Sequence, residues 1–375
     1  MSDSNANKDS KVTQKSSVFT CSSCGGSTVF DPESQSLKCE YCDSLTKINS
    51  QDGFVATELE LLAVDEQEVN NDWGTQAHVF VCKNCGGETV LEGGNISTRC
   101  VFCSSPQVVL SDELPGLKPG SVLPFKVTPK TAKKLFATWV SKRFWAPNSL
   151  KKKHKMDDKI DGVYVPYWTY DADTYSTFSG TAGNYYYVPQ TYSVVVNGRN
   201  EMRTRQVQKV RWFPVSGENS EFFDDILIND GANMNDSTMK AIEPFDLTML
   251  EAYNPQFLAG FATEKYTQGV VRLWTSVKAG IEKNIRNSVN SQILTRADVV
   301  GSINIDSDFK RVTYKHTLLP VWLSSYKFGK KVYQFCINGQ TGEVQGRAPV
   351  SPFKVMIAIA IGAVAAYYLI QWIMA

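Results

Sequence analysis

The sequence contains few histidines and none of the common motifs of nucleotide-binding or hydrolytic enzymes. It has no Gly-x4-Gly-Lys-Ser/Thr loop, no glycine fingerprint for dinucleotides and no Gly-x-Ser-x-Gly turn. Two pairs of acids lie in stretches that we expect to be turns, where acidic residues are common. No group of residues provides a nucleophile, a base and a third residue to orient them, so we predict that the protein is not an enzyme. The histidines and paired acids are His78, His154, His316, Asp171, Asp173, Asp224 and Asp225.

The first residues lack the apolar core of a secretory signal peptide. Residues 1–17 are rich in Ser, Asn and Lys, and we expect them to be disordered. Without a signal peptide, the chain should remain in a reducing compartment. Cysteines there stay as thiols and bind metals instead of forming disulfides.

The final segment lacks charge. Residues 355–375 form an apolar run of 21 residues without Asp, Glu, Lys or Arg. A run longer than about 18 such residues indicates a helix that can span a membrane. We therefore predict a transmembrane helix over 353–375, and the alternative is a buried helix of a globular core.

Charges near this helix predict its orientation. Arg347 and Lys354 precede the run and no charged residue follows it. Because positive residues stay on the cytoplasmic side, residues 1–354 should be cytoplasmic. The protein would then be a tail-anchored, single-pass protein of the cell (inner) membrane. Small residues also recur on one face of the helix, where they would allow two copies to associate: Ala358, Gly362 and Ala366.

Eight of the nine cysteines form two quartets with the same spacing, Cys-x2-Cys-x14-Cys-x2-Cys. Each Cys-x2-Cys pair turns both sulfurs toward one metal, and two pairs complete a tetrahedron. We predict two structural Zn²⁺ sites, because four thiolates leave no position for water. Iron, an iron–sulfur cluster and redox-active pairs are the alternatives. The quartets are Cys21, Cys24, Cys39 and Cys42, and Cys82, Cys85, Cys100 and Cys103; the ninth cysteine, Cys336, is expected to be a buried strand residue.

The two quartets belong to similar segments. Residues 19–44 align with 80–105, and two glycines follow the first cysteine pair in each segment. Glycine at this position permits the positive φ of a tight turn around a metal. The pattern predicts two small β zinc ribbons, exposed and rigid, at 18–46 and 79–107. The linker between them, 47–78, is expected to contain a short helix within ELELLAVDEQEV.

The charge of the ribbons disfavours nucleic acid as a partner. The formal net charge of the chain is +1, and two metal-bound tetrathiolate sites, each with two negative charges, would bring it to about −3. The first ribbon contains Asp31, Glu33, Glu40 and Asp43 against Lys38 alone. Proteins that bind nucleic acids usually present a basic face.

Residues 108–352 form the largest predicted domain, of mixed α+β class with antiparallel sheets. Thr128 and Pro129 are typical of a helix start, and the helix should continue to Phe144. Apolar residues at intervals of three or four predict a long helix over 267–292. Asn197-Gly198 between two β-like stretches predicts a hairpin.

Two other features of this domain have more than one interpretation. Val-Pro-Tyr-Trp at 165–168 resembles Leu-Pro-Val-Trp at 319–322. This indicates either two similar strand starts with a core tryptophan or an internal duplication of the domain. The basic run Lys151–Lys155 is either a solvated loop or a contact with anionic lipid.

The paired segments CSSCGG…CEYC and CKNCGG…CVFC resemble the transcription-factor-IIB-type zinc ribbon. Proteins with such segments are sometimes named after the zinc ribbon of the primosomal helicase. With LPFKVTPKTAKKLFATWVSKRFWAP, GVYVPYWTYDADT and the C-terminal span, residues 18–375 resemble a group of bacterial membrane proteins. This resemblance implies that the eight paired cysteines are zinc ligands. It also implies phage-shock-A-type and band-7 proteins as partners in envelope stress.

These observations predict a tail-anchored membrane adaptor. Its zinc ribbons and its cytosolic domain would recruit protein partners, in bacterial envelope stress or membrane maintenance. The alternative is a nucleic-acid-binding protein of replication or transcription that is tethered to the membrane.

Overall fold

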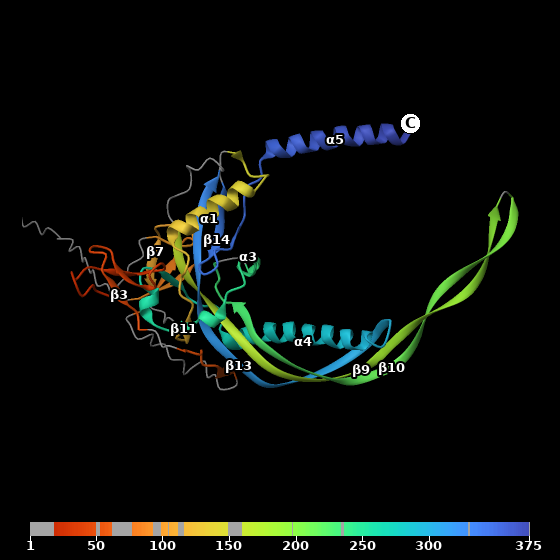
Figure 1. The fold of residues 1–375 in the computed structure, drawn as a ribbon, viewed down its shortest axis with the longest axis horizontal. Helices are drawn as coiled ribbons and strands as arrows, with labels where there is room; N and C mark the ends of the chain where they lie inside the picture. Colours follow the sequence, from red (N-terminus) through yellow and green to blue (C-terminus); the bar gives the residue numbers. More distant parts are fainter. Residues whose placement is uncertain are drawn as a thin grey trace, which may run out of the picture.

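The fold is of the α+β class with antiparallel sheets, as predicted, and ends in a single apolar helix (Figure 1). The computed structural model describes residues 19–49, 53–61, 77–92, 99–103, 105–111, 116–148, 160–196, 198–233, 236–328 and 331–374. The expected disordered residues 1–17 and the basic run Lys151–Lys155 lie outside these ranges.

The first predicted zinc ribbon, called ribbon 1 below, is a separate three-stranded antiparallel sheet, and the second is called ribbon 2. The strands of ribbon 1 are β1 (Thr28–Asp31), β2 (Ser36–Cys39) and β3 (Leu45–Lys47), in that order. β1 and β2 form a hairpin in which Thr28 lies opposite Cys39. The hairpin therefore brings its second cysteine pair back over the first, as the spacing predicted.

Ribbon 2 is not separate from the body. Its strand β5 (Ala77–Cys82) lies between β6 (Glu88–Glu92) and β7 (Val108–Ser111). β6 also pairs with β12 (Ala262–Glu264), a strand of the central sheet. The central sheet ends in the order β12-β6-β5-β7, so ribbon 2 forms one end of it.

Three long strands dominate the central sheet. They are β9 (Asp161–Val196), β10 (Arg199–Asn229) and β13 (Val299–Phe328). β9 is antiparallel to β13 up to the pair Val299–Gly183, and antiparallel to β10 over almost its whole length. Beyond Gly183 the β9–β10 hairpin continues as a twisted, two-stranded arm (Figure 1). The hairpin predicted from Asn197-Gly198 is confirmed, because Val196 pairs with Arg199 across the turn, and Gly198 has a φ of 76°.

The order of elements repeats within the body. β8 (Ser121–Val122) leads through helix α1 (Pro129–Lys142) to the β9–β10 hairpin. In the same way, β12 leads through helix α4 (Val270–Leu294) to the hairpin of β13 and β14 (Lys331–Asn338). β8 runs parallel to β13, β12 runs parallel to β9, and the central pair is antiparallel. The arrangement is that expected of two similar halves, and the internal duplication stays a prediction.

The remaining short elements cover the edges of the central sheet. β11 pairs with β8, and β15 pairs with β14. β4 (Leu59–Glu60) pairs with β13, so the start of ELELLAVDEQEV is a strand. The part of this stretch after Leu61, where the short helix was also expected, lies outside the described residues. The other bounds are β11 Glu251–Ala252, β15 Val344–Gly346, α3 Asp236–Ala241, η2 Leu247–Met249 and η3 Pro255–Leu258.

Helix α1 (Pro129–Lys142) begins as the sequence predicted. The Thr128 side chain accepts a hydrogen bond from the Thr131 amide, which caps the first turn. The helix ends at Lys142, two residues before the expected Phe144. Its buried stripe of Ala132, Phe136 and Val140 packs on the sheet, where Phe136 stacks on Phe335.

Helix α4 (Val270–Leu294) lies along the concave face of the three long strands (Figure 1). Its buried residues recur every three or four positions, as expected for one face of a helix: Val270, Leu273, Val277, Ile281, Ile285, Val289 and Ile293. The residue before the helix, Gly269, has no side chain to cap it, and the Asp230 carboxylate accepts from its amide instead, at 2.9 Å.

Helix α5 (Pro352–Met374) leaves the body as a single projecting rod (Figure 1). Among the described residues, it is the one helix that is long and apolar enough to span a membrane, over Pro352–Ile373. None of its described side chains is buried against the rest of the protein.

Candidate metal centres

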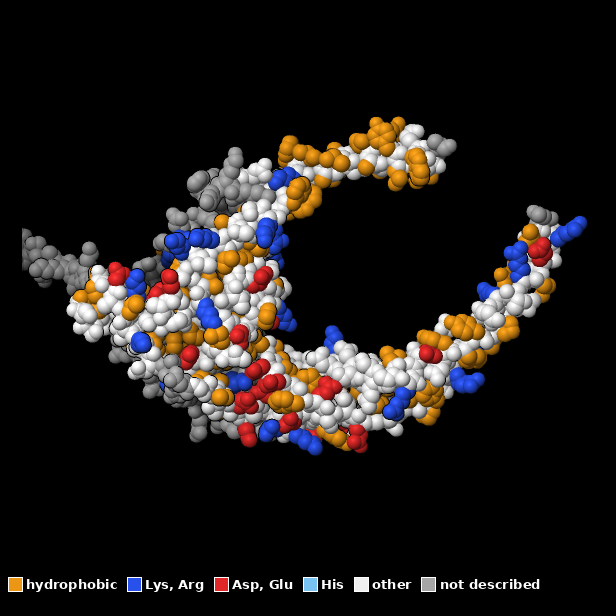
Figure 2. Space-filling view, in the orientation of Figure 1, with side chains coloured by type: hydrophobic (Ala, Val, Ile, Leu, Met, Phe, Trp, Pro, Cys, Tyr) orange, Lys and Arg blue, Asp and Glu red, His pale blue; other side chains and the backbone are white. Residues whose placement is uncertain are grey.

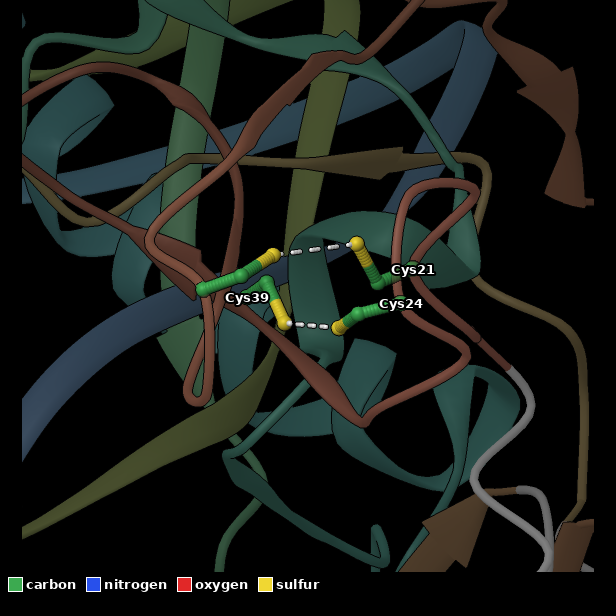
Figure 3. Close-up of side chains that lie close together, drawn as sticks. Cys21, Cys24 and Cys39 are labelled. Atoms are coloured by element: carbon green, nitrogen blue, oxygen red, sulfur yellow. Dashed lines mark hydrogen bonds between the residues drawn. The ribbon is translucent and has the colours of Figure 1, made fainter.

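The first cysteine quartet converges on a single point. Cys21 and Cys24 lie on the turn before β1, and Cys39 and Cys42 lie at and after the end of β2. The Sγ atoms of Cys21 and Cys42 are 3.6 Å apart, and those of Cys24 and Cys39 are 3.5 Å apart. Figure 3 shows Cys21 and Cys24 facing Cys39 from the opposite side of the ribbon.

The second quartet has the same geometry. The Sγ distance is 3.7 Å for both Cys82–Cys103 and Cys85–Cys100. In each quartet all four sulfurs lie within 4.8 Å of one another. A tetrahedral metal with M–S bonds of about 2.3 Å requires S–S distances of about 3.8 Å. Disulfide sulfurs would be about 2.05 Å apart, so the geometry fits two four-coordinate metals and not four disulfides.

The backbone holds both quartets by the same hydrogen bonds. In ribbon 1, the Gly25 amide donates to the Cys21 carbonyl and the Cys21 amide donates to the Gly26 carbonyl, both at 2.8 Å. The corresponding bonds of Gly86, Cys82 and Gly87 in ribbon 2 are 2.8 and 2.9 Å. Gly25 and Gly86 have φ values of 73° and 74°, which confirms the expected role of the glycine after each first pair.

Side chains next to one thiol of each quartet favour its thiolate form, whereas the pKa of Cys24 is raised in ribbon 1 and burial raises the pKa of Cys85 and of Cys100 in ribbon 2. In ribbon 1, the Ser44 hydroxyl lies 2.9 Å from Cys21 Sγ and lowers the pKa of this thiol to about 5. In ribbon 2, burial opposes ionisation of Cys103, but the Asn84 amide, 3.5 Å from its Sγ, helps to lower the pKa to about 7. The two sites thus use different side chains for the same purpose.

The second glycine of each turn leaves room for an aromatic ring. A Cβ at Gly87 would lie 2.7 Å from the buried ring of Phe102 and 2.8 Å from Asn233 Oδ1. A Cβ at Gly26 would lie 2.5 Å from the Tyr41 ring, but this ring is 68% exposed and can move away.

Gly87→Ala is therefore expected to destabilise the protein by about 2 kcal/mol, and Gly26→Ala by less, because overpacking is costly only where neighbours cannot move. Thermal unfolding of the two detergent-purified variants checks this. Equal midpoints would show that Phe102 is as free to move as Tyr41.

Each ribbon packs one side on the body, which corrects the prediction of exposed knobs. In ribbon 1, the Phe30 amide donates to the Ala259 carbonyl and its ring lies edge-on to Phe257. In ribbon 2, Cys82, Cys100 and Phe102 belong to the same core cluster as residues of β9 and β13. The apolar residues beside the cysteines are buried there, so the metal sites brace the body.

A buried carboxylate lies at the junction of ribbon 2 and the central sheet. Glu264, the last residue of β12, is 1% exposed and pairs in the ladder with Thr89 of β6. Its Oε1 accepts two hydrogen bonds from Asn233, whereas Oε2 has no partner among the described residues. Burial raises the pKa of Glu264 to about 7, despite the two bonds from Asn233.

This junction should make stability depend on pH. An unfolded Glu titrates near 4.3 and the folded one near 7, so the stabilising proton is fully bound below pH 4 and is lost as pH rises to 7. We expect a loss of about 3 kcal/mol over this range. Glu264→Gln should abolish the loss and raise the melting temperature at pH 8. Parallel pH profiles of the two proteins would contradict this assignment.

The structure also brings together acids that the sequence placed in turns. Asp171 is a buried residue of β9, and Asp224 and Asp225 form a bulge in β10. Lys315 already provides a cation for this cluster, with Nζ 2.7 Å from Asp225 and 3.7 Å from Asp171. We interpret the cluster as a structural ion network.

The other residues singled out in the sequence lie apart from the metal centres. His78 is an exposed residue of β5, and His316 is buried and stacks on Trp168 at 4.4 Å. Cys336 is buried in a strand, as expected, and burial raises the pKa of its thiol to about 12. Trp168 and Trp322 are both core residues.

Comparison with known proteins identifies one similarity along almost the whole chain. The chain is 28% identical over 348 residues to a protein of Bacillus subtilis (strain 168) described as "Uncharacterized protein YdjG". The match covers 90% of this chain and 91% of that protein, so it is not confined to the cysteine-rich segments. No protein-family model and no solved structure matches the chain.

Proposed function

We propose that the protein is a tail-anchored membrane adaptor, with two Zn²⁺ ions in its ribbons and its body in the cytoplasm. The observation that carries the proposal is α5, an apolar helix of spanning length without a buried side chain. Tetrathiolate sites without an open ligand position suit a structural role for zinc. Metal binding by four thiolates requires reduced cysteines, which agrees with a cytoplasmic location.

Residues at the base of α5 support this orientation. Lys354 Nζ donates to the carbonyls of Phe144 and Ala146, both at 2.8 Å, and so joins α5 to the end of α1. Phe144 and Trp145 are 69% and 44% exposed there, as is typical of side chains at a membrane interface. α1 has no acidic residue, and its exposed cations would lie on the cytoplasmic side of this interface: Lys130, Lys133, Lys134 and Lys142.

The partner-binding surface that we propose is the outer side of ribbon 1. Tyr41 and Leu45 remain 68% and 57% exposed there, although the opposite side of the ribbon is buried. Exposed aromatic and apolar side chains on a rigid, metal-held loop suit recognition of a protein. By resemblance, phage-shock-A-type and band-7 proteins are the partners to test, in envelope stress.

Affinity purification of the full-length protein from detergent-solubilised membranes tests the adaptor role. Tyr41→Ser/Leu45→Ser should retain both metals and lose most of the partner that the wild type captures. Val55→Ser is the matched control, because Val55 is 83% exposed and lies outside the ribbons. Equal capture of the partner by all three proteins would contradict the proposed surface.

The same preparation tests the nucleic-acid alternative. Binding by the ribbons would be tight and would weaken steeply with salt. The charge of ribbon 1 argues against such binding, because its four acids outnumber Lys38 and Lys47, and Lys38 is paired with Asp43 at 3.0 Å.

A further inference from the structure

The arm formed by the ends of β9 and β10 projects from the sheet, and none of its described side chains is buried. Beyond Gly183, β9 pairs with β10 alone, from Asn184–Arg211 to Val196–Arg199. At about 3.3 Å per residue, the arm extends about 40 Å from the sheet. Such a ribbon buries little of its own surface, so its side chains are available to a partner.

The register of the arm places all of its cations on one face. Successive residues of a strand point to opposite sides, and directly paired residues point to the same side. The odd-numbered residues of β10 therefore share a face with the even-numbered residues of β9. This face contains five cations and a single acid, Glu201; the cations are Arg199, Arg203, Arg205, Lys209 and Arg211.

Tyrosines accompany the cations on this face. The Arg205 guanidinium lies 5.3 Å from the ring centre of Tyr192, and that of Arg211 lies 5.4 Å from that of Tyr186. Glu201 pairs with Arg203 at 3.3 Å, so four of the five cations have no carboxylate from the arm beside them. The face is thus strongly positive.

The opposite face of the arm contains no charged residue. Its side chains include aromatic and apolar groups that are largely exposed to water, with exposed fractions from 43% at Tyr185 to 70% at Met202. The largest of them are Tyr185, Tyr187, Val195 and Met202. Figure 2 shows hydrophobic and basic side chains along the arm out to its tip.

We propose that the arm is a membrane-interface element that binds the anionic surface of a bilayer. Amphipathic helices that lie in the interface have an apolar face with aromatic residues and a polar face rich in Arg and Lys. The arm likewise has a basic face and, opposite it, an uncharged face with exposed tyrosines and apolar side chains. The apolar face would enter the headgroup region, and the arginines would bind lipid phosphates. Charge complementarity and the segregation of charge between the two faces carry this proposal.

The candidate membrane helix makes a bilayer the nearest anionic surface. α5 and the arm extend from the body toward the same side of the molecule (Figures 1 and 2). Two-stranded ribbons are strongly twisted, so the two faces wind around the arm. A flat bilayer can contact only a short stretch of a winding face, so we assign the contact with the bilayer to the tip of the arm. Val195 and Met202 lie there on the uncharged face, and Arg199 and Arg203 lie on the basic face.

Photo-crosslinking of the full-length protein in vesicles tests the proposal. A benzophenone amino acid replaces Met202 at the tip, Ile357 in α5 as a control for membrane insertion, or Val55 as a control for background. The vesicles contain phosphatidylcholine alone or with roughly 30% phosphatidylglycerol. We expect the Met202 reporter to crosslink lipid at least about fivefold more than the Val55 reporter, in the anionic vesicles only.

A charge-reversal variant tests the role of the arginines. Arg199→Glu/Arg203→Glu/Arg205→Glu should reduce lipid crosslinking at Met202 to background. The same reversal on α4, Arg272→Glu/Lys278→Glu/Lys283→Glu, changes the net charge equally and should leave crosslinking unchanged.

The outcomes distinguish the proposed role of the arm from the role of α5 as membrane anchor, and only the anchor is required by the proposed function. Crosslinking at Ile357 without crosslinking at Met202 would overturn the arm proposal and leave the anchor intact. Crosslinking of lipid at Met202 without crosslinking at Ile357 would support the arm proposal and overturn the proposal that α5 is a membrane anchor. Crosslinks from Met202 to a second copy of the chain, or to added nucleic acid, in place of lipid would also overturn the proposal.

Discussion

Cys100→Ala is expected to release one metal ion per chain and to lower the melting temperature by more than about 10 °C. Cys100 is 5% exposed, lies 3.7 Å from Cys85, and belongs to the core cluster that joins ribbon 2 to the body. Loss of this ligand opens a site whose metal contributes on the order of 10 kcal/mol in isolated zinc peptides. Elemental analysis and thermal unfolding of the full-length protein in detergent check this expectation.

Cys336→Ala is the matched control for this substitution. Cys336 is also fully buried and lies in the same core cluster, but no other cysteine faces it in the described structure. Its replacement should retain both metals and cost only about 1 kcal/mol, from the lost packing of one sulfur atom. Similar losses in the two variants would show that the Cys100 thiol contributes through packing alone.

Asp230→Ala is expected to cost about 4 kcal/mol or more and to loosen the start of α4. Asp230 is 1% exposed, and its carboxylate accepts bonds from the Trp168 indole and from the Gln268 and Gly269 amides, each at 2.9 Å. Removal of the carboxylate leaves these buried donors without an acceptor, which is more costly than the loss of an exposed bond. Thermal unfolding and hydrogen exchange at 270–277 measure the effect.

Asp246→Ala provides the comparison, because Asp246 also caps a helix but at an exposed site. Its Oδ1 accepts from the Thr248 amide at 3.2 Å and from the Thr248 hydroxyl at 2.6 Å. Water can replace the acceptor there, so the change in stability should be small. An effect as large as that of Asp230→Ala would contradict the assigned role of burial.

The cysteine quartets could be predicted from sequence because their geometry is local. Cys-x2-Cys spacing and the following glycines determine where the sulfurs point, and the structure places all four sulfurs of each quartet within 4.8 Å of one another. The same holds for the start of α1 and for the apolar stripes of α1 and α4, which depend on neighbours along the chain.

The integration of ribbon 2 could not be predicted, because it depends on pairing between distant residues. β6 pairs with β12, which lies more than 170 residues later in the sequence. Thr263 and Glu264 carry no local signal of this contact, and a buried glutamate is unexpected on composition alone. The strand at Leu59–Glu60 was missed for the same reason, since it forms only against β13.

The two faces of the arm were present in the sequence but required the register to be seen. Charges alternate with uncharged residues from Arg199 to Arg211, which is the period of a strand with unlike faces. The register adds that Tyr186 and Tyr192 share the charged face. The capping role of Asp230 could not be predicted from the sequence, because the groups that donate hydrogen bonds to it come from β9 and from the start of α4.

The most direct test of the account is a count of metal ions in the full-length protein, purified in detergent without added metal. The account predicts two zinc ions per chain, and unfolding when a strong chelator removes them. Fewer than two metal ions per chain, or iron with inorganic sulfide, would contradict the central claim that two structural zinc sites brace the body.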